Sequence, residues 1–130
     1  MKNNDISIRA CAPESDTPAL SQIWLEASRI AHSFIGEQRL LEQQALIETR
    51  YLPVAESWVA CVDDVPAGFI SLLDTFVGGI FVAPQWQGLG IGRRLIAHAL
   101  NLRGELSLEV YTRNTGAMRF YASLGFEELS

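Results

Sequence analysis

The feature that most constrains this chain is a run of three glycines at alternate positions, Gly88, Gly90 and Gly92. A strand-like apolar segment, 77–82, precedes it, and an apolar stripe at helical spacing over 93–102 follows it. Glycines let a backbone approach a ligand closely, and the first N–H groups of a helix have no intrahelical acceptor. The helix dipole adds partial positive charge at the same point. A strand, a glycine turn and a helix in this order therefore predict an anion-binding site.

Spacing separates the classes of protein that could use such a site. A Walker loop needs a lysine directly after its glycines, and this chain has none there. A dinucleotide-binding turn counted from Gly88 needs a glycine at position 93, which is Arg93, and it normally follows the first strand of a βαβ unit rather than hairpins. A tight turn without a ligand stays as the plain alternative. Three alternating glycines favour a diphosphate ligand over that alternative.

Periodicity elsewhere predicts a single mixed α/β domain over 1–130, with a central sheet and helices on both of its faces. The helices are expected from Asp16, as the N-cap, to Phe34, over 40–47 up to Pro53, over 93–102 and over 114–123. The strands are expected over 6–10, 58–62, 67–74, 77–82, 106–111 and from Phe126 onward. Gly78 and Gly79 inside a strand indicate a β-bulge, and the late strand–helix–strand segment predicts a parallel crossover.

Composition narrows the function classes further. The net charge of −5 argues against a general nucleic-acid binder, because phosphate binding needs a basic surplus. No apolar run approaches about 18 residues, and 1–16 lacks the apolar stretch of a signal peptide, so we expect no membrane contact and a cytoplasmic location. Cys11 and Cys61 lie far apart, with no histidine next to either, which predicts two free thiols, no disulfide and no metal site.

Two late motifs resemble those of the GCN5-related N-acetyltransferases, the GNAT family. The family's acetyl-CoA signature is similar to Phe81-Val82-Ala83-Pro84 followed by Gln87-x-x-Gly90-x-Gly92. Its other late motif is similar to Leu108-Glu109-Val110 followed by Asn114-x-x-Ala117-x-x-Phe120-Tyr121-x-x-x-Gly125-Phe126. The order of elements matches too, and Ala31-His32-x-Phe34 is similar to small bacterial members of unassigned substrate. The resemblance covers essentially the whole chain and implies a GNAT-like fold.

The resemblance implies an acetyl-CoA site made of two neighbouring segments. The pyrophosphate would be held by the turn and the start of the helix, namely Gln87, Gly88, Leu89, Gly90, Ile91, Gly92 and Arg93. The pantetheine would lie along the preceding strand, against the backbone of Ile80, Phe81 and Val82, where an N–H near Phe81 or Val82 would polarise the thioester carbonyl. Asn114 would contact the cofactor near the pantetheine.

The resemblance also implies catalytic residues, each of which has a plain structural alternative. Tyr121 lies at the family's general-acid position, although an aromatic residue on a short helix is often core. Glu109 matches a position that some protein N-terminal acetyltransferases use as a base, and a solvated strand residue is the equal alternative. His32 is a substrate-pocket candidate or simply a packed histidine. Trp24, Phe34 and Trp58 are expected in the core.

The implied activity is transfer of the acetyl group of acetyl-CoA to a primary amine of a small molecule or peptide by direct attack. The acidic charge balance mildly favours a cationic acceptor through steering. The alternative is an acyl-CoA-binding sensor or regulatory subunit without turnover. Family members usually continue beyond the Gly-Phe strand, so the C-terminal strand is expected to be truncated at Ser130, in a shortened chain or in one completed by another subunit. A monomer and a homodimer both stay open.

Overall fold

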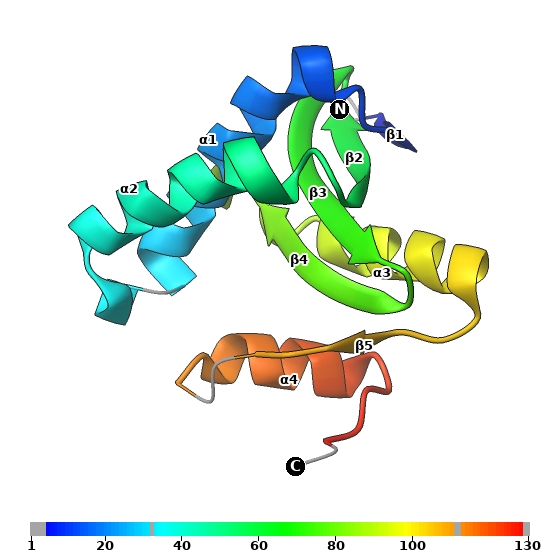
Figure 1. Ribbon diagram of the computed structural model, residues 1–130. Helices are drawn as coiled ribbons and strands as arrows, with labels where there is room; N and C mark the ends of the chain where they lie inside the picture. The colour runs from blue at the N-terminus through cyan, green and yellow to red at the C-terminus, as the bar shows by residue number, and fades with distance from the viewer. Residues whose placement is uncertain (1–4, 32, 111–112, 129–130) are drawn as a thin grey trace.

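The computed structural model describes residues 5–31, 33–110 and 113–128, and its centre is one five-stranded sheet (Figure 1). The strands follow their chain order across the sheet, as β1 (Ile6–Ala10), β2 (Glu56–Val62), β3 (Val65–Leu73), β4 (Phe76–Val82) and β5 (Ser107–Leu108). The first four strands pair antiparallel, and β5 pairs parallel to β4. The predicted mixed sheet with a late parallel crossover is confirmed.

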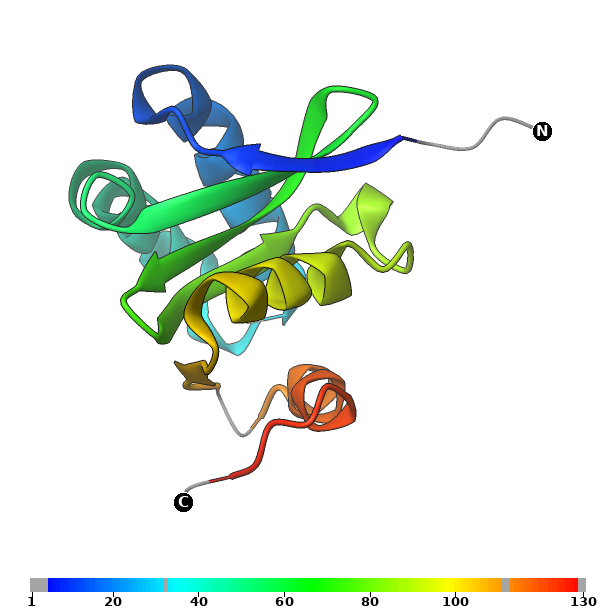
Figure 2. The ribbon, with the colours of Figure 1, turned by 90° about the vertical axis from the view of Figure 1, so that its right-hand side faces the viewer.

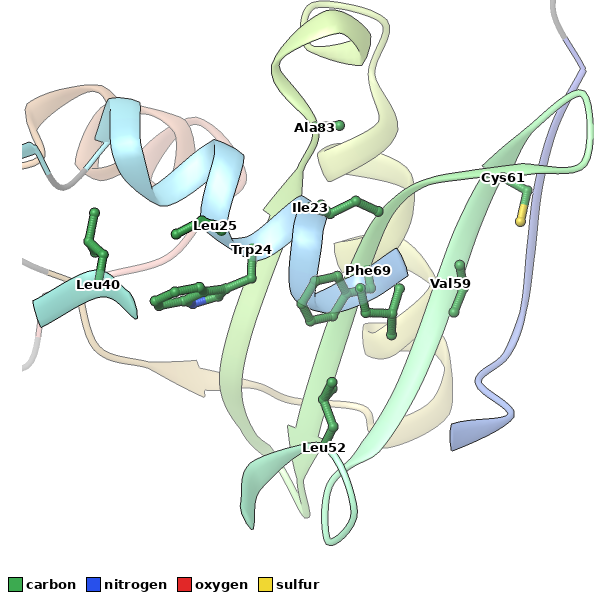
Figure 3. Close-up of a cluster of buried hydrophobic side chains, with 10 residues drawn as sticks. Ile23, Trp24, Leu25, Leu40, Leu52, Val59, Cys61, Phe69 and Ala83 are labelled. Carbon is green, nitrogen blue, oxygen red and sulfur yellow. The ribbon is translucent and has the colours of Figure 1, made fainter. Parts of the chain in front are cut away.

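Helices cover both faces of this sheet (Figure 2). On one face α1 (Pro13–Ala31) packs over β3 and β4, α2 (Glu37–Leu46) packs against α1, and the π-helical turn η2 (Ile47–Tyr51) continues α2. On the other face lies α3 (Ile91–Arg103), with α4 (Thr115–Ser123) beside it. Figure 3 shows the core of the first face, where Trp24 and Phe69 fill the space between α1 and the sheet. In the described part of the chain, no helix combines the length and apolar character needed to cross a membrane.

The third and fourth strands carry the predicted irregularity. Their register shifts between Ser71 and Leu72, because Ser71 pairs with Gly79 while Leu72 pairs with Val77. Gly78 is therefore the extra residue of a β-bulge on β4, as the paired glycines predicted. A bulge bends and twists its strand, so β4 turns away from a straight course in its middle.

The first helix begins earlier and ends earlier than predicted. Pro13 occupies its first position, where the missing N–H of proline costs nothing. Asp16 is not the N-cap: its carboxylate lies in the first turn and accepts a hydrogen bond from the Ala12 N–H at 2.8 Å. The helix stops at Ala31, and Phe34 belongs to a separate 3-10 turn, η1 (Ser33–Ile35), where its side chain is 41% exposed. The expectation that Phe34 is core was wrong.

The C-terminal segment also differs from the expectation. Among the described residues, the strand predicted over 106–111 is only Ser107–Leu108, and residues 126–128 form no strand. The Phe126 N–H instead bonds to the Tyr121 carbonyl at 3.1 Å, and the Gly125 N–H bonds to the Ala122 carbonyl at 3.0 Å. These bonds cap the end of α4 and turn the chain back onto it, so that the rings of Phe126 and Tyr121 lie 5.7 Å apart.

We expect an Asp16→Asn substitution to lower the free energy of unfolding by about 2 kcal/mol at neutral pH, since a charge-assisted hydrogen bond is lost. Asp16 is buried and accepts two hydrogen bonds from Arg9, at 2.7 and 3.0 Å. The hydrogen bond from Arg9 lowers the pKa of Asp16 below its ordinary value. Its contribution is therefore complete above about pH 4 and is lost as the pH falls through the lower, folded-state pKa.

Urea unfolding at several pH values measures this effect. The difference between the wild-type chain and the variant should shrink below about pH 4. Glu37→Gln is the matched control, because the Arg29–Glu37 ion pair has the same chemistry at 2.6 Å but is exposed on both sides. A variant as stable as the wild type at pH 7 would contradict the role given to Asp16.

Candidate functional site

A cavity of about 830 Å³ opens between the two layers of helices, along the outer edge of β4. It exists because β4 and β5 pair at only two positions, Phe76 with Ser107 and Val77 with Leu108. Beyond these positions the described parts of the two strands no longer pair, and the cavity occupies the gap. Its walls come from α1, α2, β4, the glycine turn, the start of α3, the segment after β5 and α4.

The edge of β4 offers unpaired backbone groups to this gap. In an antiparallel pair, the N–H and C=O of one residue point to the same side, and the side alternates along the strand. The Ala83 N–H bonds to the Ala67 carbonyl on the β3 side at 2.8 Å. By alternation, the backbone of Phe81 also points to β3, whereas Ile80 and Val82 point into the gap. The cavity therefore has the edge of an extended strand as one wall.

All three predicted strand residues line the cavity, but they do so in different ways. Ile80 presents its backbone N–H and carbonyl to it, and Val82 presents its N–H, since the Val82 carbonyl accepts a hydrogen bond from Gln87 Nε2 at 3.1 Å. Phe81 presents its ring, which packs 5.6 Å from the ring of Phe69 and 6.3 Å from that of Trp24. Because the Phe81 backbone faces β3, the N–H suited to polarising a carbonyl in the gap is that of Val82 or Ile80 rather than that of Phe81.

The glycine turn closes one end of the cavity and presents free donors. Gly90 has φ +80° and forms the N-cap of α3 without a side-chain cap. In the described chain the first backbone hydrogen bond of α3 runs from the Arg94 N–H to the Gly90 carbonyl at 3.0 Å, so the N–H groups of Ile91, Gly92 and Arg93 are left for a ligand. A Cβ on Gly92 would lie 3.2 Å from Cζ of Phe120, so this glycine allows α3 and α4 to pack closely.

Two predicted cofactor residues also have structural roles. The Gln87 side chain donates from Nε2 to the Val82 carbonyl at 3.1 Å and so ties the turn to the end of β4. Asn114 is the N-cap of α4, where Oδ1 accepts from the Ala117 N–H at 3.0 Å and Nδ2 stays available as a donor. Both residues line the cavity, whereas the exposed side chain of Leu89 does not. His32 lies outside the described residues.

Charge is distributed unequally along the cavity. Of the described residues that line it, only Arg93 and Glu109 are charged. Arg93 follows the end of β4, at the glycine turn. Glu109 comes directly after β5, and the parallel register places it level with the bulge in β4, toward the other end of the gap. The cavity is thus suited to an anionic group at the turn and to a cationic one at the bulge.

Tyr121 enters the cavity from α4 and is half-buried. Its ring lies 5.3 Å from that of Phe120, on the face that packs against α3. Burial raises the pKa of Tyr121 to about 12, because the phenolate would lose hydration. The hydroxyl therefore stays protonated at neutral pH and can donate a proton or a hydrogen bond.

Sequence reasoning missed the wall made by the first two helices. Trp24 was interpreted only as core; it is buried, as expected, but also lines the cavity together with Ile30 and Gln43. The spacing Trp24, Ala27 and Ile30 puts these three residues on neighbouring turns of one helix face. The signal in the sequence was Ile30, which continues the apolar face of this helix. In the structure its side chain is 65% exposed. Nothing in the sequence marked Gln43.

In the described ranges, no three His, Cys, Asp or Glu side chains are grouped to hold a metal ion. Cys11, which is half-buried, and Cys61, which is buried, are free cysteines.

Known acetyltransferases are similar to this chain in sequence. A family model described as an acetyltransferase (GNAT) domain matches residues 53–128. The chain is 34% identical over 116 residues to the peptidyl-lysine N-acetyltransferase YiaC of Escherichia coli (strain K12), covering 88% of this chain and 80% of that protein. It is also 34% identical over 123 residues to the peptidyl-lysine N-acetyltransferase YjaB of the same organism, covering 94% of this chain and 82% of that protein.

Solved structures show the same fold. The solution structure of the apo-form of YjaB from Escherichia coli superposes with a TM-score of 0.84 at 34% identity, covering 95% of this chain and 83% of that one. The PaiA N-acetyltransferase of Thermoplasma acidophilum, solved in complex with coenzyme A, superposes with a TM-score of 0.82 at 19% identity, covering 95% of this chain and 90% of that one. At 19% identity, the similarity to PaiA shows a shared fold only.

We expect Gly90→Ala to weaken binding of coenzyme A about tenfold, because a side chain in the left-handed region strains the turn that presents the free N–H groups. Gly104→Ala is a closely matched control. Gly90 and Gly104 have φ of +80° and +85°, a Cβ at either would meet nothing within 4 Å, and Gly104 lies at the opposite end of α3.

Both variants should lose about 1 kcal/mol of stability, and only Gly90→Ala should lose affinity in calorimetric titration. Equal affinities for the two variants would show that the turn does not hold the ligand.

Proposed function

Because the chain belongs to the GNAT family of N-acetyltransferases and transfers the acetyl group of acetyl-CoA to an amine, we propose that its acceptor is the side-chain amine of a lysine in a protein. The observation that carries this proposal is Glu109, the one acidic side chain among the described residues that line the cavity. A carboxylate at the end of the gap favours a cationic acceptor. Two relatives of this chain are named for peptidyl-lysine acetylation.

The residues present fit acetyl-CoA. The free N–H groups of Ile91, Gly92 and Arg93, together with the Arg93 side chain, suit the pyrophosphate at the start of a helix. The gap-facing backbone of Ile80 and Val82 suits the amide groups of the pantetheine, as an added strand would. Gln87, Gly88 and Gly90 shape the turn that would surround the pyrophosphate. The Asn114 Nδ2 adds a hydrogen-bond donor from α4. Acetyl-CoA, when bound, supplies the acetyl group as a thioester with a thiol leaving group.

The reaction needs two proton transfers, one from the acceptor amine and one to the departing sulfur, and a residue of the cavity is suited to each. A lysine amine has an ordinary pKa near 10, so it must lose a proton before it can attack a carbonyl. Glu109 is proposed to accept that proton, directly or through water. Tyr121 is proposed to donate a proton to the departing sulfur, for which its high pKa keeps it ready. The Val82 or Ile80 N–H is proposed to stabilise the negative charge that develops on the carbonyl oxygen.

We also infer a cytoplasmic location. The free thiols of Cys11 and Cys61 agree with a reducing compartment, where cysteines stay unpaired.

The proposed acceptor is tested with a peptide that contains one lysine and a blocked N-terminus. Incubation with acetyl-CoA should add one acetyl group to the lysine side chain, which mass spectrometry of the fragmented peptide locates. The same peptide with arginine in place of lysine is the control. Acetylation of polyamines or aminoglycosides in place of the peptide would identify a small-molecule acceptor, and binding of acetyl-CoA without turnover of any amine would favour a sensor.

We expect Tyr121→Phe to lower kcat about 100-fold, because it removes the proton donor while keeping the ring packing. The affinity for coenzyme A should change little. Since the pKa of Tyr121 is about 12, the loss should be the same at pH 7 and at pH 9.5, where the residue is protonated in either case.

Glu109→Gln gives the contrasting result. The activity that the Glu109→Gln variant loses relative to the wild type should be smaller at pH 9.5 than at pH 7, because more of the acceptor amine is already deprotonated in solution. The two variants therefore separate the acid from the base by pH dependence. A Tyr121→Phe enzyme with wild-type kcat would show that another group, or water, protonates the sulfur.

A further inference from the structure

An aromatic–cation contact bridges two walls of the cavity at its rim. The Arg113 guanidinium lies over the ring of Phe34, 5.6 Å from its centroid. Phe34 belongs to η1, next to Ile35, and Arg113 comes directly before Asn114; both Ile35 and Asn114 line the cavity. In Figure 1 the segment after α1 and the start of α4 lie on the same side of the molecule. The contact thus joins the wall made by α1 and α2 to the wall made by α4.

This contact orients the Arg113 guanidinium. A cation within about 6 Å of a ring centroid is attracted to the face of the ring, and a guanidinium held in this way can still donate the N–H groups that point away from the ring to a carboxylate. Three other arginines, Arg9, Arg29 and Arg103, each bind a carboxylate at 2.6–2.7 Å. No ion pair of Arg113 is found with any carboxylate of residues 5–31, 33–110 and 113–128. Arg113 is therefore an oriented cation at the mouth of the site, with its hydrogen-bonding edge available.

The position of Arg113 relative to Glu109 indicates which part of a peptide substrate would lie near Arg113. Glu109 lines the cavity, whereas Arg113 lies at its exposed rim, a few residues farther along the same segment. When a lysine extends its amine to Glu109, the peptide backbone and the residues beside the lysine stay at the rim. Because Phe34 and Arg113 adjoin Ile35 and Asn114, which line the cavity, we expect a side chain next to the acceptor lysine to lie near Arg113. A carboxylate there suits the guanidinium edge, and a basic side chain is repelled.

We propose that Arg113, held by Phe34, is a specificity-determining residue that selects lysines flanked by an acidic residue. The proposal rests on protein lysine as the acceptor. Phe34 is a positioning residue in this account, since its ring orients the guanidinium and does not meet the substrate charge itself.

The test uses three blocked peptides, each with a single lysine flanked on both sides by glutamate, glutamine or arginine. At low salt the wild-type enzyme should show a kcat/KM about fivefold higher for the glutamate peptide than for the glutamine peptide, through KM, and the lowest value for the arginine peptide. The preference should fall at 0.5 M salt, since rim charges are screened. Arg113→Gln should reduce the difference between the glutamate and glutamine peptides to less than twofold.

Matched variants separate this role from others. Arg119→Gln removes an exposed arginine of α4 and should keep the preference. Arg113→Lys should keep part of it, and Phe34→Leu should weaken it without removing the charge. Equal kcat/KM values for the glutamate and glutamine peptides with the wild-type enzyme would overturn the proposal. It would also be overturned if Arg113→Gln kept the preference, or raised only the KM for acetyl-CoA, as expected of a residue that binds a cofactor phosphate.

The test distinguishes failure of the proposal that protein lysine is the acceptor from failure of the proposal for Arg113. If the wild-type enzyme acetylates no peptide, protein lysine is not the acceptor, and the role of Arg113 falls with it. If it acetylates all three peptides equally, lysine is the acceptor and only the role of Arg113 is overturned. Because Arg113 is exposed, its variants should unfold at the wild-type temperature, and circular dichroism checks this.

Discussion

The site depends on the parting of two parallel strands. Once β4 and β5 separate after two residue pairs, the backbone of β4 pairs with a described strand on one side only, and on the other side the Gln87 side chain bonds to the Val82 carbonyl. An unpaired strand edge inside a protein must be satisfied by water or by a ligand, because unpaired polar groups are costly to bury. The bulge at Gly78 helps to bend β4, and the glycine turn then places the first turn of α3 at the end of the gap. A ligand with both amides and phosphates meets both features at once.

The same gap sets where the charged and titratable side chains of the site lie. Arg93 and the free N–H groups lie at the phosphate end, and Glu109 lies level with the bulge. Tyr121 is buried enough that its pKa rises, whereas Glu109 stays exposed to solvent. In the proposed mechanism, Tyr121 is the proton donor, for which its raised pKa suits it, and Glu109 is the proton acceptor. At the rim, the contact between Phe34 and Arg113 adds a fixed cation beyond the reacting groups.

Much of this was predictable because it rests on local rules. The bulge, the start of α3 and the capping of α4 by Asn114 follow from glycine and asparagine at particular positions. The errors arose where tertiary contacts override local preference. Asp16 has the side chain of an N-cap, yet Arg9 and the Ala12 N–H hold it inside the helix. The predicted strand at Phe126 instead folds back on Tyr121 to cap α4.

The sequence by itself determined the mixed sheet, the crossover and the glycine turn, since hydrophobic period and turn residues are properties of neighbouring positions. Only the tertiary structure decided that Ile80 and Val82, rather than Phe81, turn their backbone to the gap, because the register with β3 sets the alternation. It also decided that Trp24 and Gln43 form a wall of the cavity, and that Phe34 meets Arg113. These contacts join segments far apart in the chain, and no local pattern encodes them.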